Sequence, residues 1–227
     1  MPQATIIKDI KEPISTLTYQ DYNVSLMVMT AYYLVDIEVE GIGRVLKLDS
    51  IKNGEIWKNM DILIFNSWLW WYNRIDKPWD YIQEGNTIYK DMDIFVAYKK
   101  GLTTWANWVD SVLDTTKTKV IFQGITPSHY NGENWNEPGE KNCARQTQPL
   151  SGSTYPGGTP MEGVVLNQVL SNMSKPVYLL DITTLSQLRK DAHPSSYNMF
   201  KGMDCTHWCL SGLPDTWNQL LSAALID

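Results

Sequence analysis

The chain contains short runs of apolar residues bounded by turn-forming residues, which is the pattern of β-strands. One such run, Asn23–Met29, predicts a strand near the start of the sequence. Three more are almost continuously apolar, as in parallel strands that are buried on both faces: Met60–Asn66, Val120–Ile125 and Val177–Ile182. These runs predict a parallel sheet in the interior of the protein.

Helical periodicity fills the stretches between these strands. In Lys90–Leu113, apolar residues recur at steps of four and three, and they predict one buried face formed by Tyr98, Leu102, Trp105, Val109 and Val112. A second helix is expected at Met161–Met173. Asp215 can cap a C-terminal helix whose apolar side comprises Trp217, Leu220, Leu221, Ala224 and Leu225. Strands that alternate with helices predict an α/β fold with a parallel sheet.

The segment His129–Pro160 follows neither period. It is rich in Gly, Pro, Asn and Ser, so we expect a long irregular loop. Loops of this length are usually functional lids or disordered, and Cys143 within the segment favours an ordered lid. Because no repeat or strong linker interrupts the sequence, we expect residues 1–227 to form a single domain.

Composition and charge exclude several classes of function. A net charge of −6 and a pI near 5.1 argue against an extended basic surface, so we expect neither nucleic acid nor an anionic membrane surface as a partner. The sequence has no apolar run of about 18 residues that could span a membrane. Two sequons, at Asn23 and Asn172, fit a secretory route.

Candidate chemistry is concentrated between Met203 and Cys209. Asp204 and His207 are three residues apart, and in a tight turn the Asp204 carboxylate can reach Nδ1 of His207. That contact would fix the tautomer and leave Nε2 as a base for a hydroxyl nucleophile, as in a Ser-His-Asp triad. The alternative interpretation is a solvated turn or a core histidine.

A metal site is a second alternative for the same segment. Cys143, Cys205, His207 and Cys209 are four possible zinc ligands. However, Cys-x-His-x-Cys is not a usual zinc spacing, so we expect neither a metal nor a bound cofactor. Three cysteines are an odd number, which suggests an unpaired thiol or a partner outside the chain.

The run from Asp204 to Asn218 closely resembles the C-terminal signature of the plant trichome birefringence-like family, whose catalytic domain is called a PC-esterase domain. Matches upstream occur in the order of the family: Leu46-Lys-Leu-Asp-Ser50, Asp61-Ile-Leu-Ile-Phe-Asn66, Trp70-Trp71, Thr126-Pro-Ser-His129 and Arg189-Lys-Asp-Ala-His-Pro194. The resemblance implies an SGNH-hydrolase-like three-layer α/β fold with helices on both faces of the sheet.

This resemblance also implies an activity. The expected function is O-acetyl transfer to plant cell-wall polysaccharides (xylan, pectin or mannan) through an acyl-enzyme, with an acetyl donor such as acetyl-CoA as cosubstrate. A polysaccharide acetylesterase and a non-catalytic glycan-binding fragment are the alternatives. The family further implies a signal anchor upstream and a lumenal catalytic domain at the Golgi membrane.

The nucleophile is where the sequence departs from the family. The family carries it in a Gly-Asp-Ser block, and no Gly-Asp-Ser occurs in these residues. Ser50 follows an aspartate, but it belongs to a stretch that the family has in addition to the nucleophile block. We therefore expect this chain to be the C-terminal part of a longer protein, to lack the serine, and to be inactive alone.

The resemblance and the sequence also give expectations for the remaining candidate residues. The resemblance implies a disulfide between Cys143 and Cys205, with Cys209 bonded upstream of Met1. Asn66 matches by position an asparagine that can donate to an oxyanion. Trp68, Trp70 and Trp71 are candidates for stacking on a glycan, with at least one expected to be exposed. His129 and His193 are expected to be structural, and Arg189, Lys190 and Asp191 to form a solvated helix end.

Overall fold

The computed structural model describes residues 5–11, 13–72, 77–199 and 202–226. Its internal contacts divide the chain into two compact units, residues 1–32 and residues 33–227. The first unit is an antiparallel sheet of three strands, β1 (Ile6–Lys11), β2 (Ile14–Tyr19) and β3 (Val24–Met29), in the order β1-β2-β3. Strand β3 confirms the strand expected at Asn23–Met29.

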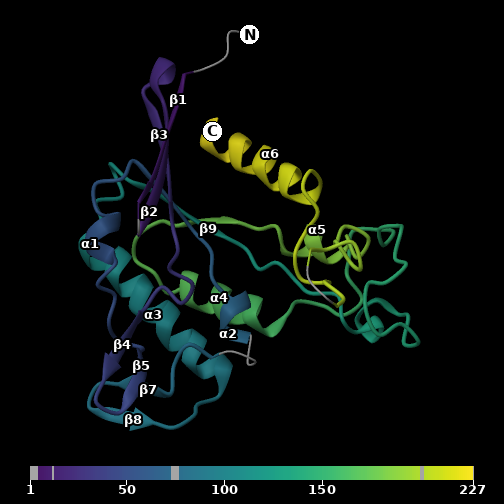
Figure 1. Ribbon diagram of the computed structural model, residues 1–227, viewed down its shortest axis with the longest axis horizontal. Coiled ribbons are helices and arrows are strands. Elements are labelled where there is room, and N and C mark those ends of the chain that lie inside the picture. The colour runs from purple at the N-terminus through teal and green to yellow at the C-terminus, as the bar shows by residue number, and fades with distance from the viewer. Residues whose placement is uncertain (1–4, 12, 73–76, 200–201, 227) are drawn as a thin grey trace. The chain divides into compact units, whose positions relative to one another are not determined.

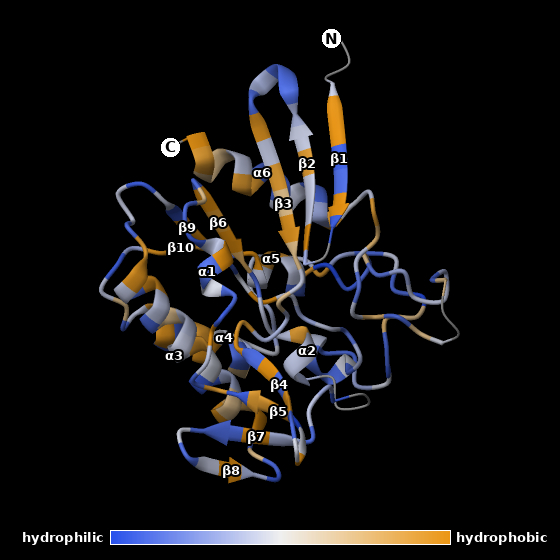
Figure 2. Ribbon diagram, turned by 60° about the vertical axis from the view of Figure 1, so that its left-hand side comes forward, coloured by the Kyte–Doolittle hydropathy of each residue, from blue (hydrophilic) through white to orange (hydrophobic). Residues whose placement is uncertain are grey.

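The second unit contains the predicted parallel sheet; its central strand is labelled in Figure 1 and all three strands in Figure 2. Its strands are β6 (Ile62–Phe65), β9 (Lys119–Gln123) and β10 (Tyr178–Leu180), in the order β10-β9-β6. Both pairings are parallel, with Phe65 opposite Phe122 and Leu180 opposite Gln123. All three apolar runs therefore form neighbouring strands. The expectation that they are buried on both faces is wrong for the two outer strands, because Ile62 and Ile64 of β6 and Tyr178 of β10 are 44%, 48% and 47% exposed.

Helices cover this sheet on both faces, which gives the predicted three layers. On one face, Trp105 of α3 (Ile94–Val112) meets Phe122 edge to face, with ring centroids 5.0 Å apart. On the other face, Trp217 and Leu221 of α6 (Leu213–Ile226) pack against the neighbouring Ile121. Adjacent strand residues point to opposite faces, so Ile121 and Phe122 anchor different helices. Helix α4 (Met161–Leu170) packs against α3.

Helix α3 begins where its sequence supplies a cap. The Asp93 carboxylate accepts hydrogen bonds from the backbone N–H groups of Phe95 and Val96, which otherwise lack helical partners. Four of the five residues of the predicted face are buried: Tyr98, Leu102, Trp105 and Val109. Val112 was expected to be buried with them but is 41% exposed. It occupies the last turn of the helix, which carries the side chain past the edge of the core.

Helix α6 differs from its prediction in two respects. Asp215 lies inside the first turn, and its carboxylate accepts from the backbone N–H of Gly212 at 2.6 Å, so it stabilises the N-terminus without being the residue that precedes the helix. Leu220 and Leu225 were placed on the buried side but are about 40% exposed, whereas Trp217 and Leu221 pack on the sheet.

The second unit also contains a four-stranded sheet that was not predicted. Four short strands, β4 (Asp36–Glu40), β5 (Gly43–Lys47), β7 (Tyr81–Glu84) and β8 (Thr87–Tyr89), pair in the order β4-β5-β7-β8 (Figure 2). Their sequences mix charged and apolar residues and are only three to five residues long, so neither period stands out. Three short α-helices, α1 (Gly54–Trp57), α2 (Leu69–Tyr72) and α5 (Thr183–Gln187), and two 3-10 helices, Gln20–Tyr22 and Gly132–Trp135, complete the described elements.

Candidate active site

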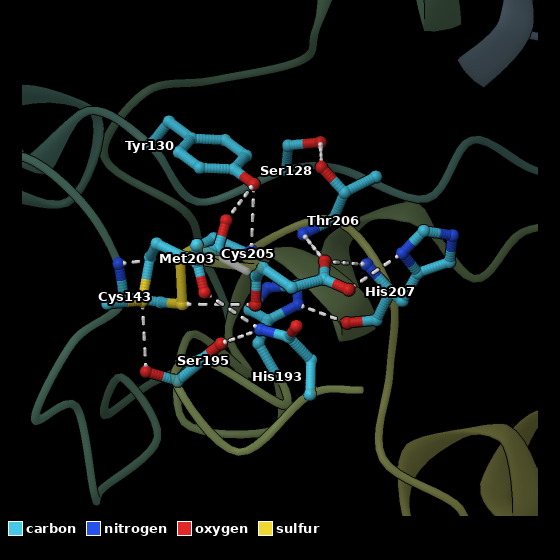
Figure 3. A network of polar contacts seen from close by, with 12 residues as sticks. Ser128, Tyr130, Cys143, His193, Ser195, Met203, Cys205, Thr206 and His207 are labelled. Carbon is cyan, nitrogen blue, oxygen red and sulfur yellow. Dashed lines mark hydrogen bonds and ion pairs between the residues drawn. A yellow bond between two sulfur atoms is a disulfide. The ribbon is translucent and has the colours of Figure 1, made fainter. Parts of the chain in front are cut away.

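Asp204 and His207 form the predicted pair in a loop that precedes α6; His207 and its neighbours Cys205 and Thr206 are labelled in Figure 3. Asp204 Oδ2 lies 2.9 Å from Nδ1 of His207, while Oδ1 accepts hydrogen bonds from the backbone N–H groups of Thr206 and His207. The loop begins in a two-way backbone bridge between Asp204 and Ser195. The predicted hydrogen bond between the two side chains is thus confirmed.

The environment of the pair differs between its two members. The Asp204 side chain is 15% exposed, whereas that of His207 is 65% exposed. Burial acts to raise the pKa of Asp204, but the backbone N–H groups of His207 and Thr206, together with the His207 ring, outweigh it and hold this pKa below its ordinary value. The carboxylate is therefore charged at neutral pH and orients an imidazole whose outer edge is open to solvent.

The disulfide between Cys143 and Cys205 ties the long loop to this site, and the pairing implied by the resemblance is confirmed. Its two Cα atoms are 5.6 Å apart, and both cysteines are buried. Because Cys205 directly follows Asp204, the bond fixes the backbone of the loop that carries Asp204 and His207. It also removes two of the four ligands that a zinc site would need. Cys209 has an exposed, free thiol.

Tyr130 gives the loop a second support that sequence reasoning missed. Its hydroxyl accepts a hydrogen bond from the backbone N–H of Cys205 and donates one to the carbonyl of Met203, both at 3.0 Å. Next to it, the hydroxyls of Ser128 and Thr206 are 3.1 Å apart. The only sequence signal for these contacts was that Thr126-Pro-Ser-His129 follows a predicted strand.

The two remaining histidines are structural, as expected. His129 is fully buried and His193 is 6% exposed, and their rings are hydrogen-bonded to each other. His193 also stacks on Trp208, with centroids 4.1 Å apart, and its Nδ1 lies 2.6 Å from the backbone carbonyl of His207. These contacts place the two histidines directly against the segment that contains His207 and Trp208.

Lys190 was expected on a solvated helix end, and that prediction is wrong. The residue is 6% exposed, and its ammonium bonds to the carboxylate of Glu137 and to the side chain of Gln146. Both partners belong to the long loop, so Lys190 anchors the segment 129–160, which also contains a short 3-10 helix at Gly132–Trp135. Arg189 pairs with Asp191. A role of this loop as a lid stays a prediction.

The three tryptophans after β6 have different environments. Trp71 is 1% exposed and packs against Tyr33, Trp79 and Tyr98, so it is a core residue and is not available for stacking on a glycan. Trp68 stacks on Phe95, and Trp70 is 38% exposed. The expected split between buried and exposed rings is therefore observed.

Asn66 and Ser50 were the other candidates for direct chemistry. Asn66 is exposed immediately after the C-terminal end of β6, where ligands bind in open α/β sheets, and its oxyanion role stays a prediction. Ser50 donates its hydroxyl to the carboxylate of Asp36 at 2.5 Å, and its carbonyl accepts from the backbone N–H of Asp36. Its hydroxyl therefore links the segment after β5 to the first residue of β4.

This arrangement of an α/β sheet and a paired Asp and His in a loop before the last helix agrees with the comparison with protein families. Residues 2–224 match the PC-Esterase family, described as a GDSL/SGNH-like acyl-esterase family found in Pmr5 and Cas1p. The chain belongs to this family. It is 58% identical to protein trichome birefringence-like 38 and 53% identical to protein trichome birefringence-like 40, both from Arabidopsis thaliana, over 95% and 99% of its length.

These matches confirm the resemblance drawn from the motifs. The chain spans 57% of the first relative and 62% of the second. Within the residues that the structure describes, no helix has the length and apolar character needed to cross a membrane.

Proposed function

We propose that this chain carries the acid–base part of an O-acetyltransferase that acts on plant cell-wall polysaccharides. The Asp204–His207 contact is the observation that carries the proposal. Asp204 engages Nδ1 of a largely exposed ring, so Nε2 is free to accept the proton of a hydroxyl. Membership of the PC-Esterase family supports the same class of chemistry.

The proposed reaction is a double displacement. His207 takes the proton of a serine hydroxyl while the serine oxygen attacks the acetyl donor, and the protonated ring then returns that proton to the leaving group. With acetyl-CoA as donor, the leaving group is the thiol. In the second half, His207 takes the proton of a sugar hydroxyl as it attacks the acetyl-serine. The protonated ring then gives this proton to the serine oxygen as its bond to the acetyl group breaks, which restores the serine hydroxyl and the neutral histidine. Asp204 stays ionised and stabilises the imidazolium in both halves.

The serine in this proposal lies outside the 227 residues, in a Gly-Asp-Ser block that the sequence does not contain. The engagement of Ser50 with Asp36 supports this assignment, because that hydroxyl already has a structural partner. Asn66, placed at the end of a parallel strand, is proposed to donate to the oxyanion. Trp68 and Trp70 are proposed to contact the polysaccharide.

Localisation in the lumen of the Golgi apparatus, with a membrane anchor upstream, is proposed on the same basis. Both sequon asparagines, Asn23 and Asn172, are exposed, which suits glycosylation in the secretory pathway. Cys209 is proposed to pair with an upstream cysteine, because its thiol is exposed and the other two cysteines are bonded to each other.

Two alternatives have specific support. The family is described as acyl-esterases, which favours hydrolysis of acetyl groups. Water would then replace the sugar hydroxyl in the second half-reaction, with the same residues. The absence of Gly-Asp-Ser favours a glycan-binding fragment without catalysis. These alternatives differ in product: transfer acetylates a polysaccharide, hydrolysis releases acetate, and a binding fragment does neither.

The test compares the 227-residue chain with a longer version that begins upstream of a Gly-Asp-Ser block. Both are incubated with labelled acetyl donor and xylan, pectin or mannan, and label is measured in polysaccharide and in free acetate. We expect transfer only with the longer protein, and its loss in His207→Ala. Activity of the short chain that disappears in Ser50→Ala would instead identify Ser50 as the nucleophile.

A further inference from the structure

Two buried histidine rings form a chain of three hydrogen-bond contacts that ends at the candidate base. His129 Nε2 lies 2.9 Å from the backbone carbonyl oxygen of Gln187, and His129 Nδ1 lies 2.7 Å from His193 Nε2. His193 Nδ1 lies 2.6 Å from the backbone carbonyl oxygen of His207. Each ring nitrogen therefore faces one partner at hydrogen-bond distance.

Counting protons shows that a neutral pair cannot form all three bonds. Both terminal partners are carbonyl oxygens, which only accept, so His129 Nε2 and His193 Nδ1 must each carry a proton. The central contact between the two rings needs a third proton. Two neutral imidazoles supply only two. If both protons went to the carbonyls, two ring lone pairs would face each other at 2.7 Å and repel, so the neutral pair keeps one proton between the rings and leaves a ring lone pair facing the carbonyl of Gln187 or that of His207.

From this geometry we infer that His129 and His193 are positioning residues that form a proton-controlled clamp on the backbone of His207. With three protons the clamp holds the carbonyls of Gln187 and His207 together, and with two it holds one of them at a time. The importance of the clamp for catalysis rests on the proposed role of His207 as base. The hydrogen bonds of the clamp itself do not depend on that role.

Neighbouring contacts explain why this carbonyl matters for the site. Asp204 binds both the backbone N–H and the ring of His207. The backbone carbonyl of His207 is the third polar group that controls the orientation of this residue. The His193 ring also stacks on Trp208, and the backbone N–H of Cys209 donates to the carbonyl of Ala192. His193 and its neighbour Ala192 therefore contact the backbone on the C-terminal side of His207.

The charges around the rings set the direction of the pH dependence. Burial lowers the pKa of both, that of His193 to about 4. The Lys190 ammonium acts in the same direction on His129, and His129 acts in the same direction on His193. The Asp191 carboxylate raises both pKa values, and Asp204 raises that of His193.

The other rings packed against His129 carry no charge at neutral pH, because they are Trp135, Trp208 and Tyr155, and burial raises the pKa of Tyr155 to about 12. The third proton therefore enters below the ordinary histidine range. The clamp is tightest in acid and loosens as pH rises.

The 227-residue chain has three histidines, so NMR can follow every imidazole. The chain is labelled with 15N in histidine rings and 13C at carbonyls and titrated over the pH range in which it stays folded. We expect His129 and His193 to take up one proton as a single unit, and the 13C signal of the residue 207 carbonyl to move with that step. The same titration of His207→Ala removes the ring of that residue and leaves its carbonyl, so the movement then reports the clamp alone.

Three variants separate the clamp from simple packing. His193→Asn keeps an amide donor near the Nδ1 position, and His129→Gln keeps one near Nε2 but cannot take up a proton. In both variants, the 13C signal of the residue 207 carbonyl should stay at the value of the hydrogen-bonded carbonyl at every pH. His193→Leu should leave it at its unbound value at every pH.

The clamp is overturned if the wild-type rings titrate independently, or if the carbonyl signal ignores their titration. Neither readout uses activity. An active longer protein with independent rings would overturn the clamp alone, whereas coupled rings in a protein with no acetyl transfer or hydrolysis would overturn the proposed function alone.

Discussion

Both carboxylate oxygens of Asp204 bind His207, one at the backbone N–H at 3.0 Å and the other at ring Nδ1 at 2.9 Å. A carboxylate that holds the main chain and the ring of one residue fixes the rotamer as well as the tautomer. The disulfide to Cys143 and the hydroxyl of Tyr130 both hold Cys205, the residue that follows Asp204. The pair is therefore preorganised before any substrate binds.

Replacement of Asp204 by Asn should reduce acetyl transfer or hydrolysis by the longer protein. The amide is uncharged, so it cannot stabilise an imidazolium, and it favours the wrong tautomer of His207. In serine proteases this change costs on the order of 10⁴ in kcat, and we expect a loss of about 10² to 10⁴. Steady-state kinetics measure it. Asp114→Asn, which alters a turn at Thr116, is the control. Equal losses in both variants would contradict a catalytic role for Asp204.

Loss of the Cys143–Cys205 bond should destabilise the chain. A bridge across 62 residues limits the unfolded ensemble, and bonds of this kind typically contribute about 2–4 kcal/mol. Urea unfolding of Cys143→Ser and Cys205→Ser measures the change. In Cys209→Ser, whose thiol is exposed and free, the free energy of unfolding should change by less than about 0.5 kcal/mol. A larger effect at Cys209 would show that its thiol has a structural partner within the chain.

Thiol counting distinguishes the short chain from the longer protein. In the 227-residue chain, an alkylating reagent should modify one cysteine under non-reducing, denaturing conditions, and peptide mapping should identify it as Cys209. In the longer secreted protein the same cysteine should be protected by its upstream partner. A free Cys209 in the oxidised, longer protein would remove the proposed second disulfide.

Stability should rise with pH between about 4 and 6.5. Burial lowers the pKa of His193 to about 4 in the folded chain, whereas an unfolded histidine titrates near 6.5. In this window the unfolded state binds more protons, so acidification favours unfolding. Thermal unfolding at several pH values measures the slope. His193→Asn should flatten it, and an unchanged slope in that variant would show that another group is responsible.

A methyl group at Gly101 should destabilise the core. A Cβ there would lie 2.8 Å from the ring of Trp71, which is itself buried. Alanine gains about 1 kcal/mol in helix propensity, but overpacking costs about 1–3 kcal/mol. We expect a net loss in Gly101→Ala by chemical denaturation. Gly139→Ala, where a Cβ meets nothing within 4 Å, is the control. Stabilisation of Gly101→Ala would mean that Trp71 can shift.

The site was predictable where chemistry depends on neighbours in sequence. Asp204 and His207 are three residues apart, so one turn brings them together without help from the rest of the fold. The clamp was not predictable in this way, because His129 and His193 are 64 positions apart in the sequence, and both were expected only to be structural, hydrogen-bonding residues. Lys190 shows the same limit: its charge indicated solvent, but Glu137 and Gln146 from the long loop pair with it.

By itself the sequence determined the parallel strands, the long helix α3 and the Asp204–His207 contact, since periodicity and short spacing act locally. Tertiary structure alone decided that Trp71 lies in the core while Trp70 is 38% exposed, that Ser50 binds Asp36, and that His193 reaches the carbonyl of His207. Each of these depends on which distant segments become neighbours when the sheets pair and the helices pack. Burial and hydrogen bonding between residues far apart in sequence follow from that packing, and no pattern in one segment specifies it.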